Sequence, residues 1–479
     1  MESGGVWTGL LTLGREGEMK WRVMVELGAA DGTVHLHEVS IGECTVAACS
    51  AETLGLSIAD GKTTLAGLQR QLVQAQTEEH CWSRRRCLHC GAQRPLKDFR
   101  RRRLTSLFGD VEVRAPRFGP CRCGVASRRT ITPVAEIMPD RCTPEYERTV
   151  AKMGASLPYR RARSLLGDFF PLGDAPEVET VRQRTLHVGA RLERQAVAPR
   201  VSAPPPEETD TITLAIDGGH VNAVRSYQVR SFEVFVAQVS NDAGKQVVFS
   251  SMPAEADRQV EQLRNVLHDL GATKTTPVTI LSDGAGGPRN LGEAASIGPT
   301  EHVLDWFHLA MRIQHVAQAA KSWPANTPAK RREGARLSDT IEHIHWRLWH
   351  GQVQRALDLI GETLVILEAT ATTTSPEATA AGKAAVVLAG LETYVAGQSD
   401  LIIDYATARG SEEPISTATT ESTVQWLLHR RMGANQQMRW SPRGAHLMLK
   451  VRTSVVNGNF DKECRIAERW ARRPFQNAA

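Results

Sequence analysis

The spacing of apolar and polar positions changes several times along the chain, and each change predicts a different kind of element. From Val6 to about Ser50 apolar and polar residues alternate in pieces, which predicts a small β-element. From Lys62 to about Glu79 apolar residues recur at helical spacing. Thr143, a capping residue, precedes Pro144 and predicts a helix through Met153; two more helices are expected over 159–169 and 177–194.

Beyond residue 210, strand-like and helical patterns follow one another. We expect strands over 211–216, 227–239 and 246–251, then a helix (255–270), a strand (278–281), a helix (288–295) and a strand (302–304). Three strands in succession, then alternating helix and strand, predict a mixed sheet flanked by helices, the ribonuclease-H-like arrangement. From Trp306 to about Arg409 the sequence is helical and alanine-rich, with breaks at 324–328 and 372–376, which predicts an all-helical insertion.

Positive charge is concentrated in one segment. The 479-residue chain has a net charge of +5, yet residues 81–130 contain 14 Lys and Arg against 3 Asp and Glu. This excess indicates a bound polyanion, because phosphate neutralisation by Lys and Arg supplies most non-specific nucleic-acid affinity. The candidate DNA contacts are the consecutive arginines Arg100, Arg101, Arg102 and Arg103; a solvated charge run is the alternative.

Four of the nine cysteines form two close pairs. Cys87 and Cys90 are separated by two residues, Cys121 and Cys123 by one, and 30 residues lie between the pairs. Two such pairs can present four thiolates to one tetrahedral Zn²⁺, so we expect a zinc-ribbon-like segment with a structural ion. Unrelated buried thiols or a redox C-x-x-C are the alternatives, and Cys81 is a reserve ligand.

Two carboxylates follow apolar, strand-like runs: Asp217 in TITLAIDGGH and Asp283 in TPVTILSDGAGG. An acidic residue that ends such a run before Gly tends to lie at the rim of a sheet. Glu421, which opens the helix-like run ESTVQWLLHRRMG, is a third candidate. Such oxygen ligands suit Mg²⁺ or Mn²⁺, and two ions about 3.5–4 Å apart can hold the attacking and leaving oxygens of an in-line displacement. The alternative for each aspartate is an ordinary Asp-Gly turn.

A chain of this length should form about three domains, because single cores rarely exceed some 250–300 residues. A segment rich in proline and acidic residues, 196–210, reads as a semi-rigid linker. The expected fold class is therefore multidomain α/β. Its parts are a β-element and helix (1–80), the zinc-ribbon-like basic segment (81–130), a small helical, helix-turn-helix-like DNA-binding domain or plain helical connector (131–195), the linker (196–210), the first part of the core (211–309), the insertion (310–415), and the last core helices with a basic C-terminal segment (416–479).

With these residues placed, the chain resembles the DDE transposases of bacterial insertion sequences, in the group whose ribonuclease-H-like core is related to Mutator-type elements. The resemblance covers about residues 87–458. It rests on the cysteine pairs, on LAIDGG, on ILSDGAG with the following HVLDWFHLAMR, and on STATTESTVQWLLHRRMGANQQMRWSPRGAHLMLKVRTSVVNG. It implies a DNA transposase that binds terminal inverted repeats and uses two Mg²⁺ or Mn²⁺ ions for strand cleavage and strand transfer.

The resemblance also assigns roles to residues. It implies that Asp217, Asp283 and Glu421 hold the metal ions, and that Asp305 and His308 of an Asp-x-x-His element shape or assist the site. Glu421 lies 138 residues after Asp283, which leaves room for the helical insertion. A helix-opening Glu also faces the positive end of the helix dipole.

Several of these assignments have alternatives. Glu412 and Glu413 lie close enough to Glu421 in sequence to replace it. His308 could instead be a buried histidine whose ring is hydrogen-bonded to backbone. Further DNA contacts are expected near the C-terminus from Arg430, Arg431 and Arg439, with Trp440 stacked on an unpaired base; solvated surface and core packing are the alternatives.

The expected partner is double-stranded DNA, as terminal repeats and target, held by a homodimer or larger assembly during synapsis. The N-terminus lacks a basic leader followed by an apolar stretch, and the longest apolar run, Ala384–Leu391, is too short for a membrane span. We therefore expect a cytoplasmic, nucleoid-associated protein without membrane contact. Two other functions stay open: a domesticated transposase acting as a DNA-binding protein, and a structure-specific nuclease on the same fold.

Overall fold

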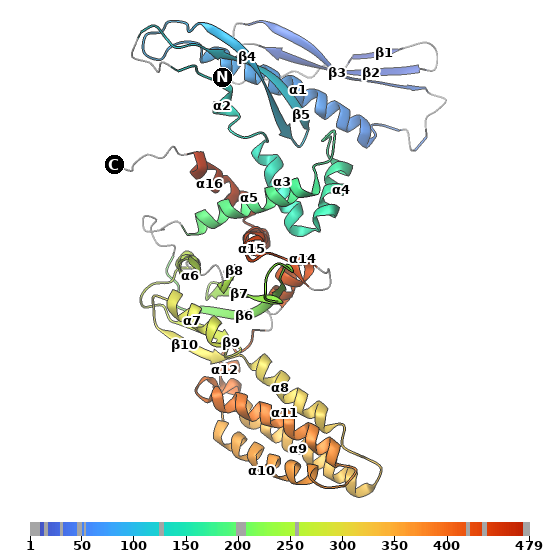
Figure 1. Cartoon of the computed structure of the whole chain (residues 1–479), viewed down its shortest axis with the longest axis vertical. Coiled ribbons are helices and arrows are strands. Elements are labelled where there is room, and N and C mark those ends of the chain that lie inside the picture. Colours follow the sequence, from blue (N-terminus) through green and yellow to red (C-terminus); the bar gives the residue numbers. More distant parts are fainter. Residues whose placement is uncertain are drawn as a thin grey trace. The chain divides into compact units, whose positions relative to one another are not determined.

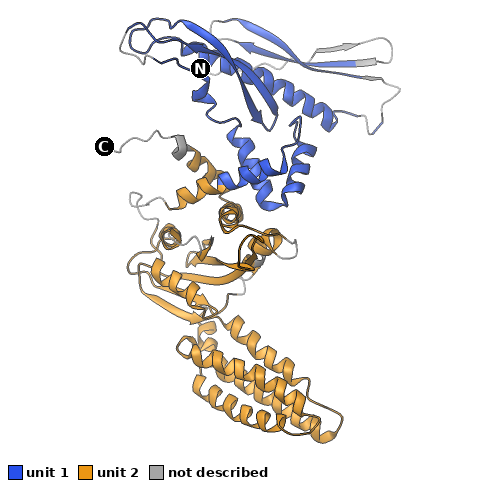
Figure 2. Cartoon of the chain, in the orientation of Figure 1, with its two compact units in different colours: residues 1–188 blue, residues 189–479 orange. Residues whose placement is uncertain are grey.

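The computed structural model describes residues 10–13, 18–28, 32–45, 50–51, 54–123, 129–197, 207–253, 258–417, 422–433 and 438–472 (Figure 1). The chain divides into two compact units, residues 1–188 and 189–479 (Figure 2). The division falls inside helix α5 (Val178–Ala196), before the expected linker, of which residues 198–206 lie outside the described part. The end of α5 packs closely against residue Leu447 of the second unit, since a Cβ added at Gly189 would meet the Leu447 carbonyl oxygen at 2.3 Å.

The first unit begins with the expected β-element. Strands β1 (Leu10–Leu13), β2 (Glu18–Gly28) and β3 (Val34–Thr45) form an antiparallel sheet in that order. Helix α1 (Ile58–Ser83) follows and starts earlier than its apolar stripe predicts. The reason is a capping box, in which Ser57 and Asp60 satisfy each other's backbone N–H groups.

A hairpin and four helices complete the first unit. Strands β4 (Leu96–Ser106) and β5 (Gly109–Phe118) pair antiparallel, and the buried side chains of β5 pack with α1 and α2 (Val134–Ile137). Helices α3 (Pro144–Ser156), α4 (Tyr159–Phe169) and α5 then follow where the sequence predicts them. The Thr143 hydroxyl accepts a hydrogen bond from the Tyr146 N–H at 3.2 Å, as expected of an N-cap.

The second unit contains a mixed five-stranded sheet with the order β10-β9-β6-β7-β8. Its strands are β6 (Ile212–Asn222), β7 (Ser231–Asn241), β8 (Gln246–Ser251), β9 (Val278–Ser282) and β10 (Thr300–Leu304). Strands β6, β7 and β8 are antiparallel neighbours, whereas β9 and β10 run parallel to β6. The expected mixed α/β sheet flanked by helices is therefore confirmed.

The two faces of this sheet have different coverings. Helices α6 (Gln259–Asp269) and α7 (Gly286–Ala295) pack on the face that carries Leu214, Ile216 and Ile280. On the opposite face, Ala215, Leu281 and Val303 join a second hydrophobic cluster with the helices that follow β10. Alternation along each strand therefore decides which residues lie beside those helices.

The segment after β10 is helical, as the sequence predicts. It comprises α8 (Trp306–Ala320), α9 (Pro328–Trp349), α10 (Val353–Ala371), α11 (Ala378–Gly397), the 3₁₀ turn η3 (Ser399–Leu401) and α12 (Tyr405–Gly410). The last elements of the described part are a π-helical turn η4 (Gln425–His429), α14 (Arg430–Met432), α15 (Pro442–Val456) and α16 (Phe460–Arg472). Helix α15 packs along β8, where the Lys450 ammonium donates to the Ser250 carbonyl at 3.0 Å.

Candidate functional site

Three aspartates follow one another across the parallel part of the sheet. Ala215 pairs with Leu281 on β9, and Leu281 pairs with Val303 on β10, so these three residues form one row on one face. Asp217, Asp283 and Asp305 each lie two residues after a member of this row. Side chains two residues apart on a strand share a face. Asp217 therefore lies on the same face of β6 as Ala215, while Asp283 and Asp305 are the residues directly after the ends of β9 and β10. The charges of both act on Asp217, so the three acids lie near one another and form the aspartate row.

Asp217 lies within strand β6 and not at its end, which differs from the sequence expectation. Strand β6 continues to Asn222 because residues 218–222 pair with β7, while its pairing with β9 stops at Ala215. Asp217 thus keeps backbone partners on the β7 side and lies just past the last β9 pair. The acid is at the edge of the parallel pairing although it is inside a longer strand.

The electrostatics of Asp217 show that charged groups gather around it. Burial raises the pKa of Asp217, whose exposed fraction is 9%; the His308 charge and the Gly218 N–H lower it, and the charges of Asp283 and Asp305 raise it. Its Oδ1 accepts from the Gly218 N–H at 2.7 Å. The net effect raises the pKa of Asp217 above its ordinary value of 3.8, as expected for a buried acid with acidic neighbours.

Asp305 is fully buried and is held by several donors. As the N-cap of α8 it accepts from the Phe307 N–H at 2.9 Å, and it also accepts from the Thr417 N–H at 3.0 Å and the Thr417 hydroxyl. His308 Nε2 lies 3.6 Å from Asp305 Oδ2 and makes no hydrogen bond within the described part. The Asp-x-x-His spacing therefore brings the two side chains together on the first turn of α8.

The loop that carries Asp283 is held by the helical insertion. Asp283 Oδ1 accepts from the Ala285 N–H at 2.9 Å, which leaves the partly buried carboxylate at the end of β9. From α11, the Tyr394 hydroxyl donates to the Asp283 carbonyl at 2.8 Å. The Gln398 amide, just after α11, donates to the Gly284 carbonyl at 3.2 Å. Sequence reasoning did not find Tyr394 or Gln398, because both lie more than 100 residues from the loop they bind.

Glu421 lies outside the described residues, but contacts on both sides of it can be described. Before it, Thr417 is bound to Asp305 through its N–H and its hydroxyl. After it, the side chains of Val424 and Leu428 lie against Gly219 of β6, where an added Cβ would meet Leu428 Cδ1 at 2.4 Å. Both flanking segments therefore contact the sheet close to the aspartate row.

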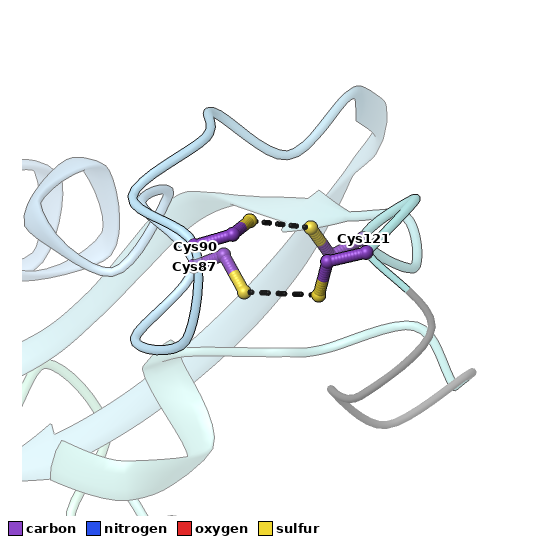
Figure 3. A group of neighbouring side chains, drawn as sticks. Cys87, Cys90 and Cys121 are labelled. Carbon is purple, nitrogen blue, oxygen red and sulfur yellow. Dashed lines mark hydrogen bonds between the residues drawn. The ribbon is translucent and has the colours of Figure 1, made fainter.

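The four paired cysteines form a compact cluster. Within the described residues, Cys87, Cys90, Cys121 and Cys123 are the group of three or more potential metal ligands whose ligand atoms all lie within 4.8 Å of one another. The Cys87–Cys123 and Cys90–Cys121 sulfurs are 3.8 Å and 3.5 Å apart (Figure 3). A tetrahedral ion with Zn–S bonds of about 2.3 Å requires sulfur separations of about 3.8 Å. The cluster can therefore hold a metal ion such as zinc.

Backbone geometry favours thiolates in this cluster. The Cys87 N–H donates to the Ala92 carbonyl, and Gly91 takes a φ of +71°, which closes a tight turn around the first pair. N–H groups of Cys90 and His89 donate to the Cys87 sulfur and lower its pKa to about 6. At Cys121 the Cys123 N–H favours the thiolate, but sharing protons with the other thiols raises the pKa to about 11. The opposite shifts at Cys87 and Cys121 show that hydrogen bonds link the ionisation of the clustered thiols.

The four consecutive arginines lie on β4 and alternate between its faces. Arg101 and Arg103 point to one side, where they pair with Glu112 (3.1 Å) and with Asp110. Arg102 donates to the Met138 carbonyl on the other side, and Arg100 is exposed. Three of the four arginines therefore have partners in the protein, so the segment is more than a charge run that contacts solvent alone.

The basic candidates near the C-terminus have separate environments. Arg431 is fully buried, with its guanidinium 5.2 Å from the ring centre of Trp440, which is 6% exposed. Trp440 is fixed through its backbone, whose N–H donates to the carbonyl of Asn222, the last residue of β6, and whose carbonyl accepts from the Val224 N–H. Arg431 and Trp440 are therefore buried in the core, and for Trp440 this favours core packing, the expected alternative to stacking on a base. Arg430 and Arg439 are exposed.

Comparison with protein-family models and with curated protein sequences gives no match for this chain. Among the described helices, none combines the length and the apolar character needed to span a bilayer.

Proposed function

We propose that this chain is a DNA transposase with a ribonuclease-H-like core, which cuts and joins DNA strands with divalent metal ions held by Asp217, Asp283 and Glu421. The observation that carries the proposal is the aspartate row, with Asp217 on β6 and Asp283 and Asp305 directly after β9 and β10. The sheet order, with three antiparallel strands followed by two parallel ones, is the order expected for such a core. The helical segment that lies between β10 and the residues flanking Glu421 is in the place of the expected all-helical insertion.

The residues at the sheet edge suit hard divalent cations. They offer carboxylate oxygens, which Mg²⁺ and Mn²⁺ prefer. The pKa of Asp217 is raised first by burial and then by the charges of Asp283 and Asp305, so a cation bound beside it would stabilise the ionised carboxylate. The described acids alone do not bring three ligand atoms within 4.8 Å, so a closed site needs a further ligand. We assign that place to Glu421 because its flanking residues contact Asp305 and Gly219.

Some of these side chains would bind the metal ions and others would position the residues around them. When bound, the ions lower the pKa of the attacking water or hydroxyl and stabilise the departing 3′ oxygen. Asp217 and Asp283 hold the charge that binds the ions. Asp305 is assigned as a positioning residue, since it accepts hydrogen bonds from Phe307 and Thr417 and its Oδ2 lies 3.6 Å from His308 Nε2. The four-cysteine cluster, holding structural zinc, would fix the basic hairpin β4–β5 that contacts DNA.

A strand-transfer assay tests this function. The full chain is incubated in Mg²⁺ with labelled DNA from the two sides of its reading frame and with a second, unlabelled duplex. We expect nicking at the terminal repeats and joining of the freed 3′ end to the second duplex. Asp217→Asn and Asp283→Asn should abolish both while DNA binding stays.

The outcomes separate the other functions. Cleavage without joining would favour a structure-specific nuclease, and sequence-specific binding without any cleavage would favour a regulator derived from a transposase. If both Asn variants still cut the DNA, these aspartates are not the metal ligands.

A further inference from the structure

An arginine-lined cavity of about 610 Å³ lies in the first unit. Its wall includes Arg101, Arg102, Arg103, Arg141, Arg184 and the hydroxyl-bearing Tyr146, and none of its lining residues is acidic. The wall is continuous because residues 141–143 run along β4, where the Thr105 N–H donates to the Arg141 carbonyl at 2.8 Å and the Thr143 N–H to the Thr105 carbonyl at 2.9 Å. Helices α3 and α5 contribute the remaining side.

Carboxylates hold three of the five arginines without lining the cavity. These pairs are Arg101 with Glu112 at 3.1 Å, Arg103 with Asp110, and Arg184 with Asp140 at 3.1 Å and Glu147 at 3.4 Å. A guanidinium has five N–H donors, so each pairing leaves donors for a ligand. The pairs also restrict the rotamers of these long side chains, which lowers the entropy lost when a ligand binds.

The other two arginines leave positive charge in the cavity. The Arg102 guanidinium donates to the Met138 carbonyl, and its buried Nε has no hydrogen-bond partner in the described structure. Arg141 is exposed, and among the described residues no carboxylate pairs with it or with Arg102. Burial raises the pKa of Tyr146 to about 12, so its hydroxyl stays a donor at neutral pH.

We propose that this cavity binds the sugar–phosphate backbone of a DNA strand. Planar guanidinium forks match phosphate oxygens, and the cavity has the volume of a site for a nucleotide-sized group. The identity of the ligand as DNA rests on the proposed function, whereas the anion site rests on the arginines alone. The proposal adds Arg141 and Arg184 to the DNA contacts and leaves Arg100 outside the cavity.

Duplex binding by the full chain tests the site. Fluorescence anisotropy with a short labelled duplex of arbitrary sequence is measured over a salt series for the wild type, Arg141→Gln, Arg141→Lys and the double variant Arg102→Gln/Arg141→Gln. Arg70→Gln is the matched control, since Arg70 is an exposed arginine of α1 in the same unit and outside the cavity. Circular dichroism verifies that each variant is folded.

We expect Arg141→Gln to weaken binding about fivefold to tenfold and the double variant to weaken it further. The slope of log affinity against log salt should fall by about 0.9 for each phosphate group that the variant no longer neutralises. Arg141→Lys should keep most of the slope, because it keeps the charge, and Arg70→Gln should match the wild type. Inorganic phosphate should compete only weakly.

Equal affinity and slope in the wild type and both Gln variants would overturn the cavity proposal, even if strand transfer is observed. A wild type that binds no duplex would overturn it as well. Cavity-dependent binding by a wild type that never cuts DNA would instead leave the cavity standing and reject the transposase.

Discussion

The four-cysteine cluster gives the most quantitative prediction. Cys90→Ser removes the most exposed of the four sulfurs and so disturbs packing least. Cys81→Ala is the matched control: Cys81 is a fully buried residue of α1, and burial raises its pKa, so we expect a core thiol and not a ligand. Zinc content of the purified full chain is measured by mass spectrometry. We expect one zinc per chain in the wild type and in Cys81→Ala, and loss of zinc in Cys90→Ser.

The stability change follows from the geometry of the cluster. Sulfur separations of 3.5 and 3.8 Å require little rearrangement for a tetrahedral ion, so a binding free energy within the usual 10–16 kcal/mol is expected. About 13 kcal/mol corresponds to a dissociation constant near 0.3 nM, and at about 1 µM free zinc the folded state then gains roughly 5 kcal/mol. For a unit of 188 residues this is a shift in melting temperature of about 10–20 °C.

Scanning calorimetry with and without a zinc chelator measures that shift. The transition of the first unit should move down in the wild type and in Cys81→Ala, and should already be low in Cys90→Ser. A wild type without zinc, or a Cys90→Ser variant that retains as much zinc as Cys81→Ala, would refute the reasoning.

Three further predictions concern the second unit. Folding raises the pKa of Asp217, so the free energy of unfolding falls as the pH rises from the ordinary pKa of 3.8 through the raised one. Asp217→Asn should therefore stabilise the metal-free protein at pH 7 by roughly 0.5–2 kcal/mol, measured by thermal melts. A lower melting temperature in Asp217→Asn would contradict this. Tyr394→Phe should keep the fold but slow DNA cleavage up to about tenfold, because it removes a hydrogen bond of about 1 kcal/mol to the Asp283 carbonyl that positions this loop. An unchanged cleavage rate would exclude that role for Tyr394. Gly219→Ala should lower the free energy of unfolding by about 1–3 kcal/mol, because its Cβ would meet Leu428 Cδ1 at 2.4 Å. Gly218→Ala is the control, since its Cβ would meet only the flexible carboxylate of Glu233 at 3.1 Å. Equal denaturant midpoints for the two variants would disprove the packing of Leu428 on Gly219.

Local signals in the sequence predict much of the fold. Thr143 and Pro144 mark the start of α3 correctly, and α4 coincides with its predicted range, because caps and apolar stripes act over a few residues. The length of β6 could not be predicted in the same way. Gly218 and Gly219 suggest a turn, but pairing with β7 extends the strand to Asn222, and pairing is a tertiary property.

The candidate site was predictable to a similar degree. Asp217 and Asp283 are readable because an acid after an apolar run is a local pattern, whereas Asp305 and His308 were named only because the resemblance implies an Asp-x-x-His element. That the three aspartates form one row depends on strand register, which no local pattern gives. The same holds for Thr417 and for the burial of Arg431 and Trp440, which depend on contacts between distant segments.

The most direct test of the central claim is to locate the bound divalent ion along the chain. Fe²⁺ takes oxygen and imidazole ligands and, with ascorbate and peroxide, generates hydroxyl radicals that cut the backbone beside it. We predict that the wild-type chain is cut next to Asp217, Asp283 and Glu421, that Mg²⁺ suppresses all three cuts, and that Asp217→Asn removes them together. Cuts elsewhere, or the same three cuts in Asp217→Asn, would contradict a shared metal site at this edge of the sheet.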